Sequence, residues 1–524
     1  MIKEKISKGE TAIGIELGST RIKATLIDDS FAPVASGSFE WENKYENGYW
    51  TYSLKDIHDG IRACFRSLAN DVFEKYGVKL EKTSAMGISA MMHGYLAFDK
   101  DDNLLVPFRT WRNTTTGKAA EELTELFGYN IPQRWSVAHL YQAILNDEPH
   151  VERIAYITTL SGYIHYLLTG KHELGIGDAS GMFPVNGNSY DEDMLEKFDT
   201  LVKDKGLPWK LKDILPEVRL AGDNNTVLSE EGARFLDPDG TFRSGIIVCP
   251  PEGDGETGMT ATNSVLPRTG NVSAGTSVFA MLVMEKPLSK VYPEIDIVMT
   301  PDGHPVAMVQ CNNCSSELDA WVNMFAEFAS LAGFEISKSR VYSLLYKNAM
   351  TADRSCKGLT AYNYLSGEHI TGVHSGRPMF FRTPDSKLNL ALFMNTQLYS
   401  AFSTLKLGME ILFGKEQVVA DKFLAHGGLF KVEGVAQQIL ADALDTPVSI
   451  METAGEGGSW GIALLAAFAA SGNKKSLGEW LESEVFGNMK VSTIAPTKEG
   501  VEGFEEFIKN YRKGLDAEKL LGEI

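Results

Sequence analysis

The sequence predicts a mixed α/β protein built from two similar halves, and three patterns support this prediction. Residues 13–28 alternate apolar and polar positions on both sides of a Gly-Ser-Thr turn, which is typical of a β-hairpin. Residues 270–284 repeat the pattern around Gly-Thr-Ser, almost half a chain length later, as a duplicated domain would. Residues 422–450 read as a strand, a Gly-Gly turn, a helix and a strand, which is one βαβ unit.

The remaining segments fit the same fold class. In chain order, we expect a strand, a Met-His-Gly turn and a second strand within 84–98, a helix at 153–169, a short strand at 245–249 and an amphipathic helix in the last twenty or so residues. No low-complexity segment or long linker interrupts the pattern. We place the domain boundary just before the second hairpin, so that the predicted domains are 1–266 and 267–524.

Composition excludes several classes of function. The 524 residues include 50 Lys and Arg against 69 Asp and Glu, a formal net charge of −19, which disfavours nucleic acid and anionic membranes as main partners. The charged N-terminus lacks an apolar signal core, and the longest apolar run, 461–470, is too short to span a membrane. Five cysteines are too few for a disulfide framework, and we read Cys311 and Cys314 as buried thiols. We therefore expect a cytoplasmic globular protein.

The two hairpin turns are candidate phosphate-binding sites. A turn of glycine and hydroxyl residues exposes backbone N–H groups with little steric bulk, so a phosphate can approach closely. Gly18-Ser19-Thr20 and Gly275-Thr276-Ser277 both have this composition, and Lys23 adds a positive charge near the first. The alternative for each turn is a plain hairpin connection.

Asp254 is the candidate general base. It lies between Gly253 and Gly255, directly after the strand predicted at 245–249, at the strand end where α/β sheets usually bind ligands. A carboxylate there can accept the proton of a hydroxyl that attacks phosphorus. The alternative is an N-cap aspartate that opens the helix beginning at Glu256.

Three further segments could contact a ligand. His93 lies in a turn between apolar strands and could equally be a core or turn histidine. Trp111-Arg112-Asn113 offers an aromatic surface together with guanidinium and amide hydrogen-bond donors, a set that suits hydroxyl-rich sugars. Asp178 lies in a run of small residues, where we expect an exposed acid on a surface turn.

These segments resemble the FGGY carbohydrate kinases, most closely the xylulokinase branch. The resemblance covers roughly residues 11–470 and follows the family order: IGIELGSTRIKATLID, MMHGYLAFD, TWRNTTT, GIGDASGM, EGDGETG, SAGTSVF, NYLSGEH and HGGLFKVEGVAQQILADAL. It implies two actin-like (ribonuclease H-like) ATPase domains with ATP and the sugar in the cleft between them.

The resemblance also implies a role for each candidate residue. Asp254 would be the general base, and the sugar would contact Met92, His93, Trp111, Asn113 and Asp254. ATP would bind Gly18, Ser19, Thr20, Lys23, Gly275 and Thr276 through its phosphates, and Gly427 and Gly428 beside the adenosine. Magnesium would be held by Glu16, where the family usually has Asp, and by Asp254.

The expected function is therefore an ATP- and Mg²⁺-dependent kinase for a ketopentose, with xylulose as the first substrate. Ribulose, L-xylulose, gluconate or glycerol are the alternative acceptors. Two other classes stay open, an actin-like ATPase that phosphorylates no sugar and a sugar-sensing pseudokinase. The expected partners are the sugar and ATP, without nucleic acid or membrane, and a homodimer is left open.

Overall fold

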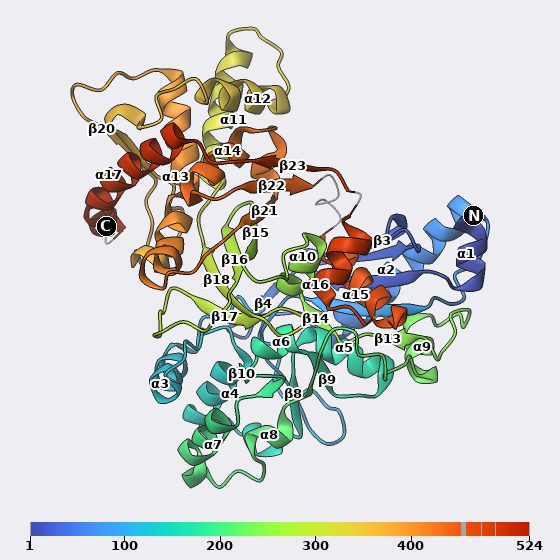
Figure 1. Cartoon of the computed structure of the whole chain (residues 1–524). Coiled ribbons are helices and arrows are strands. Elements are labelled where there is room, and N and C mark those ends of the chain that lie inside the picture. The colour runs from blue at the N-terminus through green and yellow to red at the C-terminus, as the bar shows by residue number, and fades with distance from the viewer. Residues whose placement is uncertain (1, 452–456, 473, 488, 523–524) are drawn as a thin grey trace. The chain divides into compact units, whose positions relative to one another are not determined.

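The computed structural model describes residues 2–451, 457–472, 474–487 and 489–522. It divides into two compact units. Unit 1 comprises Met1–Leu266, Asp296–Val306 and Glu456–Asn488, and unit 2 comprises Pro267–Ile295, Ala307–Gly455 and Met489–Ile524. The chain thus returns to unit 1 twice after it has begun unit 2 (Figure 1).

The sheet of unit 1 has the strand order β3-β2-β1-β6-β13, with β14 also paired to β6. Its strands are β1 (Ala12–Leu17), β2 (Arg21–Ile27), β3 (Pro33–Glu40), β6 (Ala85–Ala90), β13 (Ile247–Val248) and β14 (Glu252–Gly253). β1, β2 and β3 are antiparallel neighbours, whereas β6 runs parallel to β1 and β13 runs parallel to β6. If these strands are numbered by their order in the chain, the strand order of the sheet is 3-2-1-4-5.

Unit 2 repeats this order. Its sheet runs β18-β16-β15-β21-β22-β23, formed by β15 (Thr269–Ala274), β16 (Val278–Val283), β18 (Pro305–Cys311), β21 (Lys422–His426), β22 (Val448–Met451) and β23 (Val491–Ile494). β15 and β16 are antiparallel, and β15, β21 and β22 are parallel. Because each unit opens with a hairpin and then adds parallel strands, the two halves share one topology.

Helices cover both sheets, and shorter strands join the loops of each unit. The helices of unit 1 are α1 (Ile2–Lys8), α2 (Leu54–Tyr76), α3 (Gly117–Phe127), α4 (Ser136–Leu145), α5 (Leu160–Thr169), α6 (Ile176–Ser180), α7 (Glu192–Leu201), α8 (Leu211–Ile214), α9 (Glu230–Leu236), α10 (Asp254–Ala261), α15 (Gly457–Ser471) and α16 (Leu477–Trp480). Its shorter strands are β4 (Lys44–Glu46), β5 (Tyr49–Thr51), β7 (Leu96–Phe98), β8 (Tyr156–Thr158), β9 (Glu173–Gly175), β10 (Val185–Asn186), β11 (Ser189–Tyr190), β12 (Glu217–Arg219) and β17 (Asp296–Met299). Unit 2 contains α11 (Ser316–Leu331), α12 (Lys338–Ala349), α13 (Leu390–Glu410), α14 (Val435–Leu444), α17 (Lys498–Gly522), β19 (Leu359–Tyr362) and β20 (Met379–Arg382).

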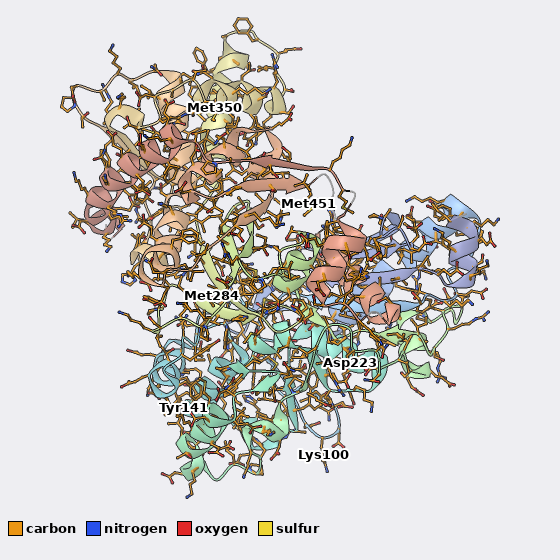
Figure 2. All side chains as sticks on the ribbon, viewed as in Figure 1. Lys100, Tyr141, Asp223, Met284, Met350 and Met451 are labelled. Carbon is orange, nitrogen blue, oxygen red and sulfur yellow. The ribbon has the colours of Figure 1, made fainter. Side chains whose placement is uncertain are left out.

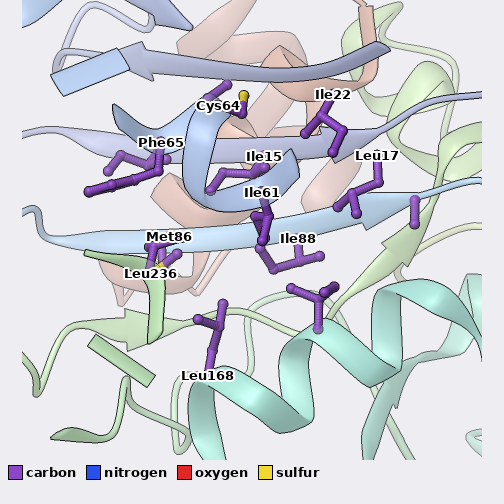
Figure 3. Close-up of a cluster of buried hydrophobic side chains, with 14 of the residues drawn as sticks. Ile15, Leu17, Ile22, Ile61, Cys64, Phe65, Met86, Ile88, Leu168 and Leu236 are labelled. Atoms are coloured by element: carbon purple, nitrogen blue, oxygen red, sulfur yellow. The ribbon is translucent and has the colours of Figure 1, made fainter. Parts of the chain in front are cut away.

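One face of the unit 1 sheet packs against α2. Alternate residues of β1, among them Ile15 and Leu17, point to this face and meet Ile61 and Phe65 of α2 in a buried cluster (Figure 3). A strand directs successive side chains to opposite faces, so Gly14 and Glu16 point to the other side of the sheet. Side chains fill the space between helices and sheet in each unit (Figure 2).

That other face is covered by α15, which approaches unusually closely. A Cβ on Gly14 would lie 2.0 Å from the carbonyl oxygen of Ser459, and a Cβ on Gly461 would lie 2.0 Å from that of Thr257 in α10. Real Cβ atoms do not tolerate such distances. The two glycines therefore allow α15 to pack tightly between β1 and α10.

Most predicted elements are confirmed. Both hairpins, the strands within 84–98, the strand within 245–249, the βαβ unit and the last helix are present, and the fold class is mixed α/β. The single helix predicted at 153–169 is wrong at its start. Residues 156–158 form β8, because the aromatic and β-branched run Tyr-Ile-Thr pairs antiparallel with β7, and α5 begins only at Leu160.

Two predictions from composition can also be compared with the structure. All five cysteines are buried, free thiols, as expected for Cys311 and Cys314. Across the helices described, none has the length and apolar character needed to cross a membrane.

The close approach of α15 makes Gly14 a sensitive position. Gly14→Ala should lower the free energy of unfolding by about 1–3 kcal/mol, because the added methyl group overpacks the interface with α15. Denaturant unfolding measures this change. The control is Gly414→Ala, an exposed helical glycine with open space around its Cβ position, which should be neutral or slightly stabilising. Equal stability of the two variants would contradict the packing argument.

Candidate active site

Two aromatic side chains bind the backbone of the turn between β1 and β2, and two residues of the turn are exposed to solvent. Trp41 donates its indole N–H to the carbonyl oxygen of Gly18 at 2.7 Å, and the Tyr52 hydroxyl donates to that of Ser19 at 2.6 Å. The rings of Trp41 and Tyr52 stack on one another, with centroids 4.2 Å apart. Ser19 and Thr20 remain exposed. The turn therefore presents a fixed, solvent-facing edge on which a phosphate could bind.

A surface depression of about 440 Å³ joins this turn to the predicted sugar loop. It is lined by Ser19, Thr20, Trp41, Glu42, Asn43, Trp111 and Arg112. The guanidinium of Arg112 lies 3.9 Å from the ring centre of Trp50, so this cation is supported by an aromatic face. The structure thus brings Ser19 and Thr20 together with Trp111, which the sequence places ninety residues later.

Asn113 has a different environment from that of Trp111. Its side chain is buried, its oxygen accepts the backbone N–H of Trp50 at 2.8 Å, and its nitrogen donates to the carbonyl oxygens of Trp50 and Thr110, both at 2.9 Å. The amide therefore joins the 110–113 loop, which carries Trp111 and Arg112, to β5.

Asp254 is the first residue of α10, and Gly253 occupies the N-cap position. Its carboxylate therefore does not play the part of an N-cap side chain. It accepts the backbone N–H of Met92 at 3.1 Å, which places the Met-His-Gly turn directly beside it. The side chain is exposed, yet the surrounding protein removes part of its hydration and raises its pKa above the ordinary aspartate value.

His93 is buried and neutral. It has a positive φ of 67°, and its Nδ1 lies 3.2 Å from the carbonyl oxygen of Gly181. Burial, with the nearby positive charge of Arg134, lowers the pKa of His93 well below its ordinary value. An Nδ1–H donated to Gly181 leaves Nε2 as the hydrogen-bond acceptor of the ring.

Glu16 and Lys23 are direct partners across the first hairpin. The Glu16 carboxylate reaches the start of α15, where it accepts the backbone N–H of Ser459 at 3.2 Å. Desolvation and the negative charge of Asp254 raise the pKa of Glu16 to about 6, although Lys23 and the N–H groups of α15 oppose this rise. The effect of Asp254 means that the two predicted magnesium ligands interact within one unit.

The donor set of Glu16 and Asp254 fits magnesium in its chemistry. Magnesium prefers carboxylate oxygens and is usually held by one or two carboxylates, water and substrate phosphates. Within the described ranges, no group of three or more His, Cys, Asp or Glu side chains is arranged as a metal cage. A magnesium ion held here would therefore complete its coordination with water and phosphate oxygens.

A group of buried acids lies near enough to Asp254 to interact with its charge. The prediction of an exposed acid at Asp178 is wrong, since this residue lies in α6 and is fully buried. Its carboxylate accepts the Thr159 hydroxyl at 2.7 Å, and its backbone N–H donates to buried Glu252 at 2.9 Å. Burial raises the pKa of Asp178 to about 6 and raises those of Glu252 and Glu256 well above their ordinary values. Asp178 lies in the motif GIGDASGM, and Glu252 and Glu256 lie in EGDGETG, but neither motif indicates that the three acids are buried together.

The second predicted turn and the Gly-Gly turn lie together in unit 2. Gly427 has a φ of 112°, and a Cβ there would lie 2.2 Å from the carbonyl oxygen of Ala274, the residue before Gly275. Glycine is therefore required both for the backbone conformation and for the close approach of β21 to β15. Gly275 itself has open space around its Cβ position, and Thr276 is exposed.

A cavity of about 510 Å³ adjoins these turns. Its lining includes Ser315, Tyr342, Tyr346, Gly428, Leu429 and Lys431. Ser315, which lines the cavity, donates its backbone N–H to the carbonyl oxygen of Gly275 at 3.0 Å, so the lining of the cavity contacts the second turn. Neither tyrosine was predicted, because their helix, α12, carries no distinctive motif. The cavity offers aromatic and polar groups, as small-molecule binding sites commonly do.

Comparisons with known proteins find similarity over most of the chain. Residues 11–236 match the N-terminal domain of the FGGY family of carbohydrate kinases, and residues 270–470 match its C-terminal domain. Xylulose kinase of Haemophilus influenzae is 22% identical, over 84% of this chain and 87% of its own length. The structure of ligand bound xylulose kinase from Lactobacillus acidophilus is 17% identical, with a TM-score of 0.77 over 97% of this chain and 98% of its own. Plasmodium falciparum glycerol kinase with ADP is 14% identical, with a TM-score of 0.75 over 96% and 98%.

The environment of Glu16 predicts a pH-dependent cost to stability. An acid with a raised pKa in the folded state binds protons more tightly there, so its contribution to stability falls as pH rises through that pKa. In metal-free buffer, the unfolding free energy of Glu16→Gln relative to that of the wild type should rise by about 1 kcal/mol when the pH is raised from 5 to 8. Denaturant titrations at both pH values measure it. The exposed control Glu74→Gln should show no such gain, and a gain equal to that of Glu16→Gln would refute the assignment.

Proposed function

Because this chain belongs to the FGGY family of carbohydrate kinases, we propose that it transfers a phosphoryl group from ATP to a hydroxyl of a ketopentose, with xylulose as the first candidate. The family resemblance predicted from the sequence motifs is confirmed, and with it the sugar kinase class of phosphotransferase and the two actin-like ATPase domains. The proposal adds the acceptor and the roles of individual residues.

The hydrogen bond from Met92 to Asp254 is the observation that carries these roles. It joins an exposed carboxylate at the start of α10 to the turn that carries His93. Asp254 takes the proton of the attacking hydroxyl, and its raised pKa makes it a better base than a freely hydrated aspartate. Met92 and His93 border the sugar from one side. Because His93 is neutral, its Nε2 can accept a hydrogen bond from a sugar hydroxyl.

Trp111 and Asn113 complete the proposed sugar site. Trp111 offers an aromatic face in the depression beside Ser19 and Thr20, and apolar faces of sugars suit such a surface. Asn113 acts through the loop it holds, since its amide is occupied by Trp50 and Thr110.

The phosphates of ATP are assigned to the two turns. Gly18, Ser19 and Thr20 form the first, with Lys23 supplying positive charge, and Gly275 and Thr276 form the second. Gly427 and Gly428 border the adenosine, for which the cavity beside Ser315 is the supporting observation. Positioning and electrostatic stabilisation supply most of the rate of phosphoryl transfer, so no covalent intermediate with the protein is needed. Glu16 and Asp254 would hold a magnesium ion, which would offset negative charge on the phosphates.

Asp254→Asn tests the base. The variant should lose a factor of roughly 10²–10⁴ in turnover, because an amide cannot take the proton, while its affinity for ATP stays close to that of the wild type. Turnover is measured as sugar-dependent ADP release, and affinity by calorimetry. The matched control is Asp193→Asn, an exposed aspartate in the first turn of α7, which should behave like the wild type. If Asp254→Asn keeps wild-type turnover, Asp254 is not the general base.

A substrate panel tests the acceptor. ADP release is measured with D-xylulose, L-xylulose, ribulose, gluconate and glycerol, each at the same concentration and against a reaction without sugar. We expect the largest stimulation with D-xylulose. A larger stimulation by another compound would identify that compound, in place of D-xylulose, as the preferred acceptor.

The same panel separates the two other classes of function. ADP release at one slow rate with every compound would indicate an actin-like ATPase. Sugar binding without ADP release would indicate a sugar sensor, a class suggested by Glu16 at the position where the family usually has Asp.

A further inference from the structure

The second turn is held by hydrogen bonds from one neighbouring loop, residues 311–315. The backbone N–H of Cys314 donates to the carbonyl oxygen of Thr276 at 2.9 Å, and that of Ser315 donates to the carbonyl oxygen of Gly275 at 3.0 Å. The carbonyl oxygens of Gly275 and Thr276 are thereby fixed, while Thr276 itself remains exposed. Any displacement of the loop would displace the turn with it.

The first turn is fixed at the equivalent atoms by different means. There the carbonyl oxygens of Gly18 and Ser19 accept hydrogen bonds from the side chains of Trp41 and Tyr52. Both hairpins thus hold the carbonyls of their first two turn residues. The first turn is held by bulky aromatic side chains, whereas the second turn is held by the backbone of a loop. The second turn is therefore rigid only if the loop itself is rigid.

Two buried side chains hold that loop, Asn313 from within it and Glu368 from the segment 363–369. One carboxylate oxygen of Glu368 accepts the backbone N–H of Asn312 at 2.8 Å, the backbone N–H of Asn313 at 3.3 Å and the Asn313 amide at 3.2 Å. The Asn313 oxygen in turn accepts the backbone N–H groups of Leu365 and Ser366 at 2.9 and 3.0 Å. Every one of these contacts lies within unit 2.

A third side chain, the amide of Asn363, completes the network. Asn363 donates its side-chain N–H to the carbonyl oxygen of Cys314 at 2.8 Å, next to the N–H that binds the turn. Glu368 is completely buried, which raises its pKa to about 7, and its hydrogen bonds with Asn313 and Asn312 oppose this rise. A carboxylate buried at such a cost is unusual unless its hydrogen bonds are needed.

We propose that Glu368 and Asn313 are positioning residues for the phosphate donor, which hold the 311–315 loop and, through it, the Gly275–Ser277 turn in the shape that binds phosphate. Neither residue touches the nucleotide in this proposal. It rests on the proposed function, since it takes the second turn as a phosphate site. It adds the specific claim that nucleotide affinity depends on Glu368 while sugar affinity does not.

The test measures the dissociation constants of ATP and of D-xylulose by calorimetry, and the KM values of both where turnover is seen. Glu368→Ala should weaken ATP binding about tenfold, because the N–H groups of Asn312 and Asn313 lose their acceptor and the loop shifts. Sugar affinity should change by less than about twofold. Glu368→Gln keeps an oxygen acceptor in the same place and should restore most of the ATP affinity.

Glu518→Ala is the matched control. Glu518 is also a completely buried glutamate of unit 2, and it accepts the backbone N–H of Arg377, which is not part of the 311–315 loop, at 2.7 Å. Its loss should lower stability without changing either affinity. If Glu368→Ala does not fold, Asn363→Ala removes the single bond to Cys314 and should weaken ATP binding severalfold.

Unchanged ATP affinity in a folded Glu368→Ala or Asn363→Ala variant would overturn the proposal. An equal loss of ATP and sugar affinity would overturn it too, because it would indicate a general structural role. The binding measurements do not depend on phosphoryl transfer. A wild type that binds ATP but phosphorylates no sugar would therefore contradict the proposed function, while the comparison of ATP affinities would still test the role of Glu368.

Discussion

The close packing of α15 against β1 is the constraint on which the site of unit 1 depends. Gly14 and Gly461 remove the side chains that would separate α15 from the sheet and from α10. At this distance the N–H of Ser459 reaches Glu16, and the Ser459 hydroxyl lies 2.9 Å from that of Thr25 in β2. The helix that begins with Asp254 therefore rests on a layer that also fixes Glu16. The two carboxylates interact because one helix sets the positions of both.

The hairpin turns show how one local structure can be made rigid in two ways. A Gly-hydroxyl turn is intrinsically adaptable, since glycine adds little steric restriction. In each unit the carbonyl oxygens at the first two turn positions are bound from behind, by aromatic side chains in unit 1 and by the 311–315 loop in unit 2. A turn held in this manner can bind an anion without being reorganised first, which lowers the entropic cost of binding.

Features with a local cause could be predicted from the sequence, and features with a long-range cause could not. The hairpin of β1 and β2 follows from alternation around one turn, and Asp254 stands out because it lies between two glycines after a strand. The burial of Asp178 depends on Thr159 and Glu252, which no spacing rule connects to it. Glu368 lies in the motif NYLSGEH, but its contacts cannot be predicted for the same reason, since its partners in the 311–315 loop lie more than fifty residues away.

The late return of the chain to unit 1 also constrains its biosynthesis. The Gly14 face of the sheet obtains its covering helix only when residues 457–471 have left the ribosome. At about 5–20 residues per second, the first 266 residues wait on the order of ten to forty seconds for that segment. During this interval the Gly14 face of the nascent sheet has no covering helix, so unit 1 can complete its packing only after most of unit 2 has been synthesised.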